Sequence, residues 1–156
     1  MYNEQQIQAY LNRLHYNKEI TLTREVLDEL IYAHQCSIPF ENLDVYDFQK
    51  EISLTEEALY DKFIVQRRGG YCFEMNGFFC VMLRSMGFDA RPCLCRVMFG
   101  LTEPSQNLFD HRGTIVTLDG KDYFCEVGLG GACRQHLWKF RVRDCGQRIP
   151  KMYGLR

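Results

Sequence analysis

The spacing of apolar residues changes near residue 87, and this change constrains the fold more than any other feature of the sequence. Before it, apolar residues recur at i, i+3, i+4 and i+7, the spacing of one face of an amphipathic helix. After it, they fall into short runs rich in β-branched and aromatic residues, which is typical of strands. We therefore predict an α+β fold, with a helical bundle over residues 1–87 and antiparallel strands over residues 88–133.

Punctuating residues indicate where the helices of the first part begin and end. Thr23 suits an N-cap, residues 53–56 fit a capping box that starts at Ser53, and Gly87 suits the position after a helix C-terminus. Pro39 and a glycine pair interrupt the helical spacing. The helices expected on these grounds cover residues 4–14, 23–36, a stretch that opens at 53, and 72–86.

An Asp-Gly pair at residues 119–120 predicts a tight hairpin of type I′ in the second part. With a two-residue turn, Leu118 faces Lys121. His111 and Glu126 then share one face of the sheet as diagonal neighbours, about 7–8 Å apart at Cα. A slip of one residue in register would place them on opposite faces. The strands expected cover residues 90–99, 114–118 and 123–127.

The eight cysteines fit neither a disulfide scaffold nor a zinc site. Nothing in the sequence indicates secretion, and an apolar content of 46% can supply a core without crosslinks. Because the chain lacks a CxxC pair, no metal site is predicted. Cys93 and Cys95 alternate along a strand and so face the same side. We interpret every cysteine except Cys72 as a buried small hydrophobe.

Cys72 has a setting that the other cysteines lack. It follows Arg-Gly-Gly-Tyr at residues 68–71 and opens a predicted helix. The partial positive charge and free N–H groups of a helix N-terminus stabilise a thiolate, and glycines let a backbone or a substrate approach closely. On this feature alone, a nucleophile and a structural cysteine behind a glycine break are about equally compatible with the sequence.

His111 and Glu126 would add the partners that a nucleophilic cysteine requires. An imidazole takes the proton of the thiol, and a carboxylate fixes the tautomer of the imidazole. The alternative is a surface histidine at a strand entrance and an ordinary acid at a sheet edge. Glu126 lies between apolar residues, however, where a carboxylate is costly unless it is paired.

Three segments resemble one enzyme family. Residues 38–43 read IPFENL, residues 68–72 read RGGYC, and residues 126–130 read EVGLG, with His111 between the last two. They resemble the IPFENL signature, the RGG-aromatic-Cys motif, the histidine and the DVGFG segment of the arylamine N-acetyltransferases, in the same order and at similar spacing. The resemblance covers roughly residues 4–133.

The resemblance implies a Cys-His-acid triad in a papain-like arrangement, formed by Cys72, His111 and Glu126. The family has Asp at the third position, so the side chain of Glu126 is one methylene longer. The resemblance also implies an ion pair between Glu41 and Arg68 that anchors the loop before the nucleophile. A pocket for substrate and CoA is implied at a segment that departs from the family's Gly-Phe-Gly: Gly128, Leu129 and Gly130.

By the same resemblance, the substrates are acetyl-CoA and a small aromatic amine or hydrazine, and the acetyl group passes through an acetyl-cysteine intermediate. Acetyl-CoA is a co-substrate, and no metal takes part. Family members are longer and resemble a helical bundle followed by a β-barrel and an α/β lid. We therefore expect this chain to hold the bundle and an incomplete antiparallel β-barrel.

Residues 134–156 form a basic segment that departs from the family pattern, with seven Lys and Arg against one Asp. We interpret it as a solvated tail and expect no nucleic-acid partner. No membrane partner is expected either, because no apolar stretch approaches the ~20 residues of a membrane span. The N-terminus lacks a signal-peptide pattern, so the cytoplasm is the expected location. The oligomeric state has no signal in the sequence.

Two other functions are compatible with these features. One is a non-catalytic fragment of the family, whose incomplete barrel leaves strand edges open to association. The other is a different Cys-His-acid enzyme, such as a thiol hydrolase or a transglutaminase-like protein, because the same triad occurs on unrelated folds.

Overall fold

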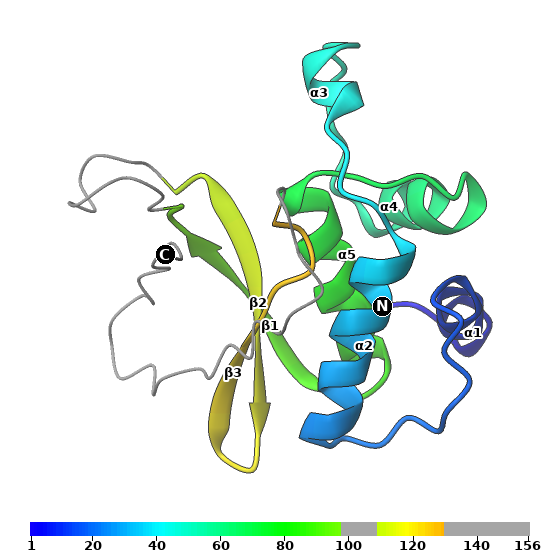
Figure 1. The fold of residues 1–156 in the computed structure, drawn as a ribbon, viewed down its shortest axis with the longest axis vertical. Coiled ribbons are helices and arrows are strands. Elements are labelled where there is room, and N and C mark those ends of the chain that lie inside the picture. Colours follow the sequence, from blue (N-terminus) through cyan, green and yellow to red (C-terminus); the bar gives the residue numbers. More distant parts are fainter. Residues whose placement is uncertain (98–108, 130–156) are drawn as a thin grey trace.

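The computed structural model describes residues 1–97 and 109–129 of the chain, and these form helices followed by an antiparallel sheet (Figure 1). The α+β fold predicted from the apolar spacing is therefore confirmed. The helices are α1 (Glu4–Arg13), α2 (Arg24–Ser37), α3 (Leu43–Tyr46), α4 (Glu56–Tyr60), the π-helix η1 (Asp61–Val65) and α5 (Cys72–Ser85). The strands are β1 (Asp89–Cys95), β2 (His111–Leu118) and β3 (Lys121–Cys125).

Helix α5 lies between the sheet and the other helices, and it packs on β1 and β2 (Figure 1). The ring of Phe78 in α5 meets those of Tyr2, Tyr10 and Phe63 at centroid separations of 5.0–5.6 Å. These rings are almost fully buried, so α5 carries much of the apolar core on the face opposite the sheet. The helix that begins at Cys72 is thus a rigid central element.

The caps at the helix ends were predicted correctly in two places and wrongly in one. Thr23 caps α2 by accepting a hydrogen bond from the Val26 N–H, and Gly87 has φ of +97° after α5. The capping box expected at Ser53 is wrong. Thr55 is the N-cap of α4 instead, because its backbone is extended and its hydroxyl accepts from the Ala58 N–H at 3.4 Å, whereas Ser53 contacts Thr55.

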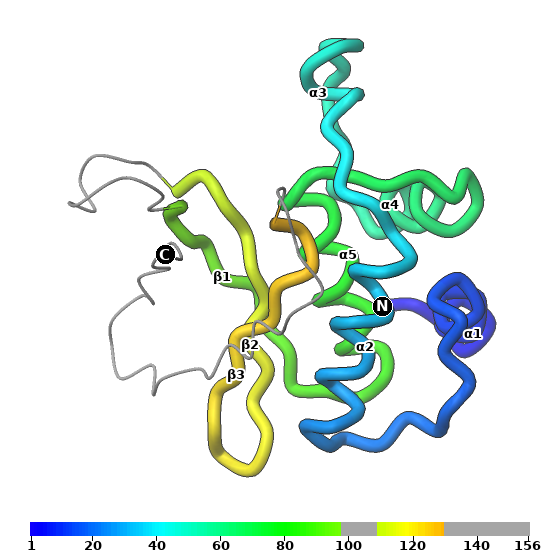
Figure 2. Tube along the Cα trace, viewed as in Figure 1, coloured from blue at the N-terminus to red at the C-terminus, as the bar shows by residue number. Residues whose placement is uncertain are grey.

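Helix α3 has no counterpart in the prediction, and η1 is a π-helical stretch within the helix that was expected to open at residue 53. Helix α3 projects from the body of the molecule and has no side-chain cap (Figure 2). In η1, the Gln66 N–H donates to the Asp61 carbonyl at 2.8 Å, a five-residue hydrogen bond that widens the helix. The wider turn buries the side chains of two adjacent residues: Phe63 is fully buried and Lys62 is 9% exposed.

The three strands pair in the order β1-β2-β3, all antiparallel. Leu118 is paired with Lys121, and Asp119 and Gly120 both have positive φ, so the predicted type I′ turn and its register are confirmed. Strand β3 ends at Cys125, two residues earlier than expected. Glu126 therefore follows the strand and lies outside the ladder.

Some predictions concern parts of the chain that lie outside the described residues. These are the end of the strand expected over 90–99, the assignment of Gly130, and the basic segment 134–156. The boundaries at residues 87 and 133 between a bundle, a partial barrel and a tail also remain predictions. His34 of α2 belongs to the core: it is fully buried and its Nδ1 lies 2.9 Å from the Tyr10 hydroxyl.

Candidate active site

Cys72 is the first residue of α5, and the loop before it is built from close backbone contacts. Tyr71 is the N-cap with an extended backbone, and its N–H donates to Glu74 Oε2 at 3.1 Å. A Cβ on Gly69 would lie 1.9 Å from the Pro39 carbonyl oxygen, and one on Gly70 would lie 3.0 Å from Glu74 Oε2. The glycine pair is therefore required by close approach, and it delivers a half-buried Cys72 to the helix start.

His111 and Glu126 meet at the opposite side of the site. Nε2 of His111 lies 2.5 Å from Oε2 of Glu126, and the two residues are 1% and 5% exposed. His111 opens β2 and Glu126 follows β3, so the β2–β3 register brings them together. In such a dry setting, a carboxylate holds an imidazole in one orientation and stabilises its charged form.

Asn76 joins the acid to α5. Its Nδ2 donates to Glu126 Oε1 at 2.8 Å, and its Oδ1 accepts from the Val127 N–H at 3.1 Å. The Gly128 N–H also donates to Glu126 Oε1, at 2.6 Å. Asn76 was missed by the sequence reasoning, although it stands four residues after Cys72 and therefore on the same helix face.

The protonation of His111 links it to both partners. Burial lowers the pKa of His111, but hydrogen bonds with Cys72 and Glu126 and the charge of Glu126 outweigh it and raise that pKa to about 10. At neutral pH the imidazole is therefore protonated. A protonated imidazole at this position can donate its proton to a leaving group.

The comparison with known proteins agrees with this geometry. A family described as N-acetyltransferase matches residues 23–148, most of the chain. The chain belongs to this N-acetyltransferase family.

Two matches give the relationship more detail. An arylamine N-acetyltransferase / N-hydroxyarylamine O-acetyltransferase of Salmonella typhimurium is 44% identical over 126 residues, which are 80% of this chain and 44% of that protein. A solved arylamine N-acetyltransferase from Salmonella typhimurium superposes with a TM-score of 0.76 at 41% identity, covering 83% of this chain and 47% of its own. This chain thus spans less than half the length of these relatives.

Two further structures bear on the triad and on the co-substrate. The arylamine N-acetyltransferase of Bacillus cereus, described as having a unique Cys-His-Glu catalytic triad, has a TM-score of 0.69 at 28% identity and covers 83% of this chain and 50% of its own. The Mycobacterium marinum enzyme in complex with CoA has a TM-score of 0.73 at 35% identity and covers 81% of this chain and 47% of its own.

The segment after Glu126 crosses the start of α5 in this family member. A Cβ on Gly128 would lie 3.0 Å from Asn76 Nδ2 and 3.1 Å from the Cys72 Cα. The backbone can pass this close to Cys72 only because Gly128 has no side chain. Leu129 is the next described residue, and Gly130 lies beyond the described range.

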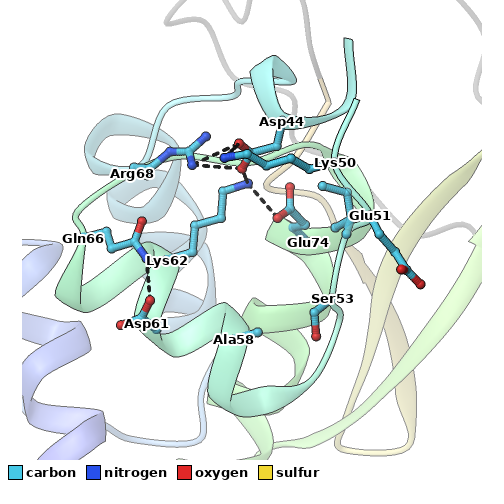
Figure 3. Close-up of a pocket in the computed structure, with 11 residues that line it drawn as sticks. Asp44, Lys50, Glu51, Ser53, Ala58, Asp61, Lys62, Gln66, Arg68 and Glu74 are labelled. Atoms are coloured by element: carbon cyan, nitrogen blue, oxygen red, sulfur yellow. Dashed lines mark hydrogen bonds and ion pairs between the residues drawn. The ribbon is translucent and has the colours of Figure 1, made fainter. Parts of the chain in front are cut away.

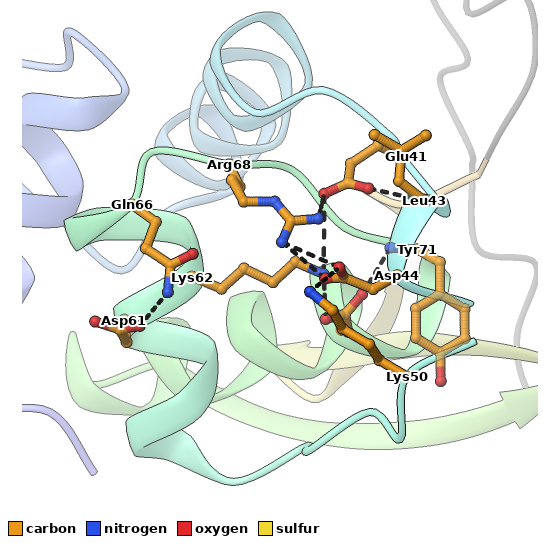
Figure 4. Close-up of polar contacts among 10 residues, drawn as sticks. Glu41, Leu43, Asp44, Lys50, Asp61, Lys62, Gln66, Arg68 and Tyr71 are labelled. Atoms are coloured by element: carbon orange, nitrogen blue, oxygen red, sulfur yellow. Dashed lines mark hydrogen bonds and ion pairs between the residues drawn. The ribbon is translucent and has the colours of Figure 1, made fainter. Parts of the chain in front are cut away.

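A cluster of five charged residues, here called the Lys62 cluster, supports the other side of α5 (Figures 3 and 4). Arg68 lies 2.7 Å from Glu41 and 2.9 Å from Asp44. Lys62 lies 3.0 Å from Asp44 and 2.7 Å from Glu74. Glu41 and Arg68 therefore form an ion pair within a larger network, whose other members the sequence reasoning missed.

The network connects to Cys72 through Glu74. One oxygen of Glu74 binds Lys62, and the other accepts from the Tyr71 N–H directly before the nucleophile. Glu74 is 2% exposed and would be costly to bury without Lys62. Burial raises the pKa of the neighbouring Asp44 carboxyl, but hydrogen bonds from Lys62 and Arg68 outweigh it and hold that pKa well below its usual range.

A cavity of about 280 Å³ opens beside the Lys62 cluster (Figure 3). Its walls include Lys50, Ser53, Gln66 and parts of the cluster, and none of the triad residues borders it. Most of its charged groups are already paired with one another. The cavity is therefore separate from the candidate site, which lies on the side of α5 that faces Glu126.

Within residues 1–97 and 109–129, no group of three or more His, Cys, Asp or Glu side chains is arranged to hold a metal ion. The same part of the chain contains no helix that is long and apolar enough to cross a membrane.

Proposed function

We propose that this site transfers an acetyl group from acetyl-CoA to the nitrogen of an arylamine or arylhydrazine through an acetyl-Cys72 intermediate. The observation that carries the proposal is the pairing of His111 with Glu126 at 2.5 Å, beside the helix that begins at Cys72 and whose Asn76 also binds Glu126. The Bacillus cereus relative supports Glu as the third member of such a triad.

In the first half-reaction, the Cys72 thiolate attacks the thioester carbonyl of acetyl-CoA. The carbon–sulfur bond to CoA breaks, the CoA thiolate leaves with the proton of His111, and the acetyl group stays on Cys72. Glu126 holds the imidazole in place throughout. Backbone N–H groups at the start of α5 are the candidate donors to the oxyanion, because the first N–H groups of a helix have no partner within it.

In the second half-reaction, the acceptor nitrogen attacks the acetyl-Cys72 thioester. His111, now neutral, takes the proton of the nitrogen, and the Cys72 thiolate leaves. The cycle therefore ends with the thiolate–imidazolium pair that began it. No metal is needed at any step.

We further propose that Gly128, Leu129 and Gly130 line the pocket for acetyl-CoA and acceptor, within an incomplete barrel and a papain-like arrangement of the triad. The close passage of Gly128 over Cys72 supports this assignment, and the CoA complex of the Mycobacterium marinum relative supports CoA as co-substrate. Nucleic acid and membranes are not among the proposed partners, and the cytoplasm is the proposed location.

The test is turnover. Purified protein is incubated with acetyl-CoA and an arylamine, and free CoA and the N-acetylated amine are separated by chromatography. We expect both products in equal amounts, lost in Cys72→Ala and kept in Cys36→Ala, which alters an exposed cysteine. CoA release without an acetylated amine would favour a thiol hydrolase, and no release at all would favour a non-catalytic protein.

A further inference from the structure

A pair of thiols lies on the same face of the sheet as His111. Cys93 and Cys95 follow one another on that face of β1, and their Sγ atoms are 3.8 Å apart. Cys95 is paired in register with His111, and Cys93 with Gly113. Neither thiol has a role in the proposed acetyl transfer, and sequence reasoning had treated both as inert core residues.

The two thiols differ in accessibility and in acidity. Cys95 is 3% exposed, whereas Cys93 is only partly buried. A hydrogen bond from Cys95 lowers the pKa of the Cys93 thiol, and a hydrogen bond from the Gly113 N–H lowers it further. Together these two bonds outweigh burial, which raises that pKa. An accessible, acidic thiol beside a second thiol is the combination found in cysteines that react with peroxides.

We propose that Cys93 and Cys95 form an oxidative modification site, at which a hydroperoxide converts the two thiols to a reversible disulfide beside the triad. The Cys93 thiolate attacks one peroxide oxygen, the O–O bond breaks, and Cys93 becomes a sulfenic acid. The Cys95 sulfur then attacks that sulfur and displaces its hydroxyl group. Overall the two thiols lose two electrons and two protons, and hydrogen peroxide becomes two molecules of water.

A disulfide between residues i and i+2 of one strand requires the backbone of that strand to move. Residues i and i+2 of a strand are about 6.6 Å apart at Cα, near the upper end of the ~4.4–6.8 Å that disulfides span. Closing the bond therefore draws in β1 at the residue paired with His111. Oxidation is expected to displace His111 from Cys72 and to slow acetyl transfer. The slower transfer rests on the proposed function, whereas the formation of the disulfide is independent of it.

The tryptic peptide of residues 85–96 makes the site directly measurable, because Cys93 and Cys95 are its only cysteines. The protein is treated with hydrogen peroxide and then with iodoacetamide, digested, and analysed by mass spectrometry. We expect this peptide to be lighter by two hydrogen atoms, to resist alkylation, and to regain both alkylation sites after dithiothreitol. Cys95→Ser should instead leave Cys93 as a sulfenic acid that dimedone traps.

Acetylation of Cys72 is measured in parallel, at a peroxide dose that leaves Cys72 open to alkylation. We expect at least a tenfold slower acetylation in the oxidised wild type, reversed by dithiothreitol, and little change in Cys93→Ser/Cys95→Ser. Full alkylation of both thiols after peroxide, or a bond from either one to another cysteine, would overturn the site. A disulfide with no loss of rate would overturn its link to His111. If the reduced protein never acetylates Cys72, the proposed function fails while the mass of the peptide still decides the modification site.

Discussion

Asn76 donates a hydrogen bond to Glu126 Oε1 at 2.8 Å, while the other carboxylate oxygen of Glu126 faces His111. Asn76 stands one helical turn after Cys72, so α5 carries Cys72 and the donor to Glu126 on a single rigid element. The three segments that carry Cys72, His111 and Glu126 are thereby held in one arrangement. We therefore expect a substitution of Asn76 to change the reaction rate through Glu126 and not through a contact with substrate.

Replacing Asn76 by Ala should lower kcat by about 10- to 100-fold, because a buried carboxylate oxygen that loses a donor costs ~1–3 kcal/mol. The KM for acetyl-CoA should change little, since Asn76 acts through Glu126. Steady-state kinetics measure both constants. The matched control is Gln35→Ala, which removes a donor to the Glu126 backbone carbonyl and leaves the carboxylate bonds intact. A loss of kcat as large in this control as in Asn76→Ala would contradict the role given to the carboxylate bond.

Replacing Glu126 by Gln should cost far more than replacing it by Asp. Gln removes the charge that stabilises the His111 imidazolium and permits the wrong tautomer, a change worth about 10³–10⁴-fold in kcat. Asp keeps the charge but draws the carboxylate back by one methylene, which should cost on the order of 10²-fold through misplacement. Equal losses in the two variants would show that charge is not what Glu126 contributes.

Replacing Lys62 by Met should destabilise the protein by about 3–5 kcal/mol, because Glu74 and Asp44 would remain buried with fewer partners. Chemical denaturation measures this loss. Lys62→Met/Glu74→Gln should recover part of it, since Gln still accepts from the Tyr71 N–H and no buried charge is left on α5. A double variant no more stable than Lys62→Met would contradict the pairing.

Alkaline pH should weaken the fold through His111. Its pKa is about 10 in the folded chain and 6.5 ordinarily, so the folded state binds a proton that the unfolded state has released. The resulting stability is fully present below pH 6.5 and is lost as the pH rises through about 10. The Tm of the wild type should therefore fall between these values more steeply than that of His111→Gln, and parallel curves would refute the raised pKa.

Acidic pH should weaken the fold through His34. Burial lowers the pKa of His34 to about 3, with a smaller contribution from the charge of Arg13. Between pH 6.5 and about 3, the unfolded chain binds a proton that the folded chain excludes, so stability falls as the pH falls. Urea denaturation of His34→Gln should show a flatter acid limb than the wild type, whatever its stability at neutral pH.

The sequence predicted the parts of the site that depend on local pattern. The Asp-Gly turn determined the β2–β3 register, and that register brings His111 close to Glu126, which lies just past the end of β3. The glycine pair placed Cys72 at a helix start. Each of these features is set by residues close together in the chain.

The features that escaped prediction depend on long-range contacts. Nothing in the local sequence pattern marks Lys62 as buried, and only the π-turn and the approach of Asp44 and Glu74 make it a buried cation. The sequence around Asn76 gives no sign of its role, because its partner Glu126 lies 50 residues away in the chain. The Ser53 cap failed because Thr55, two residues later, offers the same hydroxyl and takes the cap instead.

The most direct test identifies the residue that carries the acetyl group after a single turnover. The protein is mixed with a stoichiometric amount of acetyl-CoA, quenched, digested and mapped by mass spectrometry. The tryptic peptide of residues 69–84 contains Cys72 and the buried Cys80, which serves as an internal control. We predict one acetyl group on Cys72, none on Cys80, and complete removal by an added arylamine. An unmodified Cys72, or acetyl groups spread over several cysteines, would contradict the account.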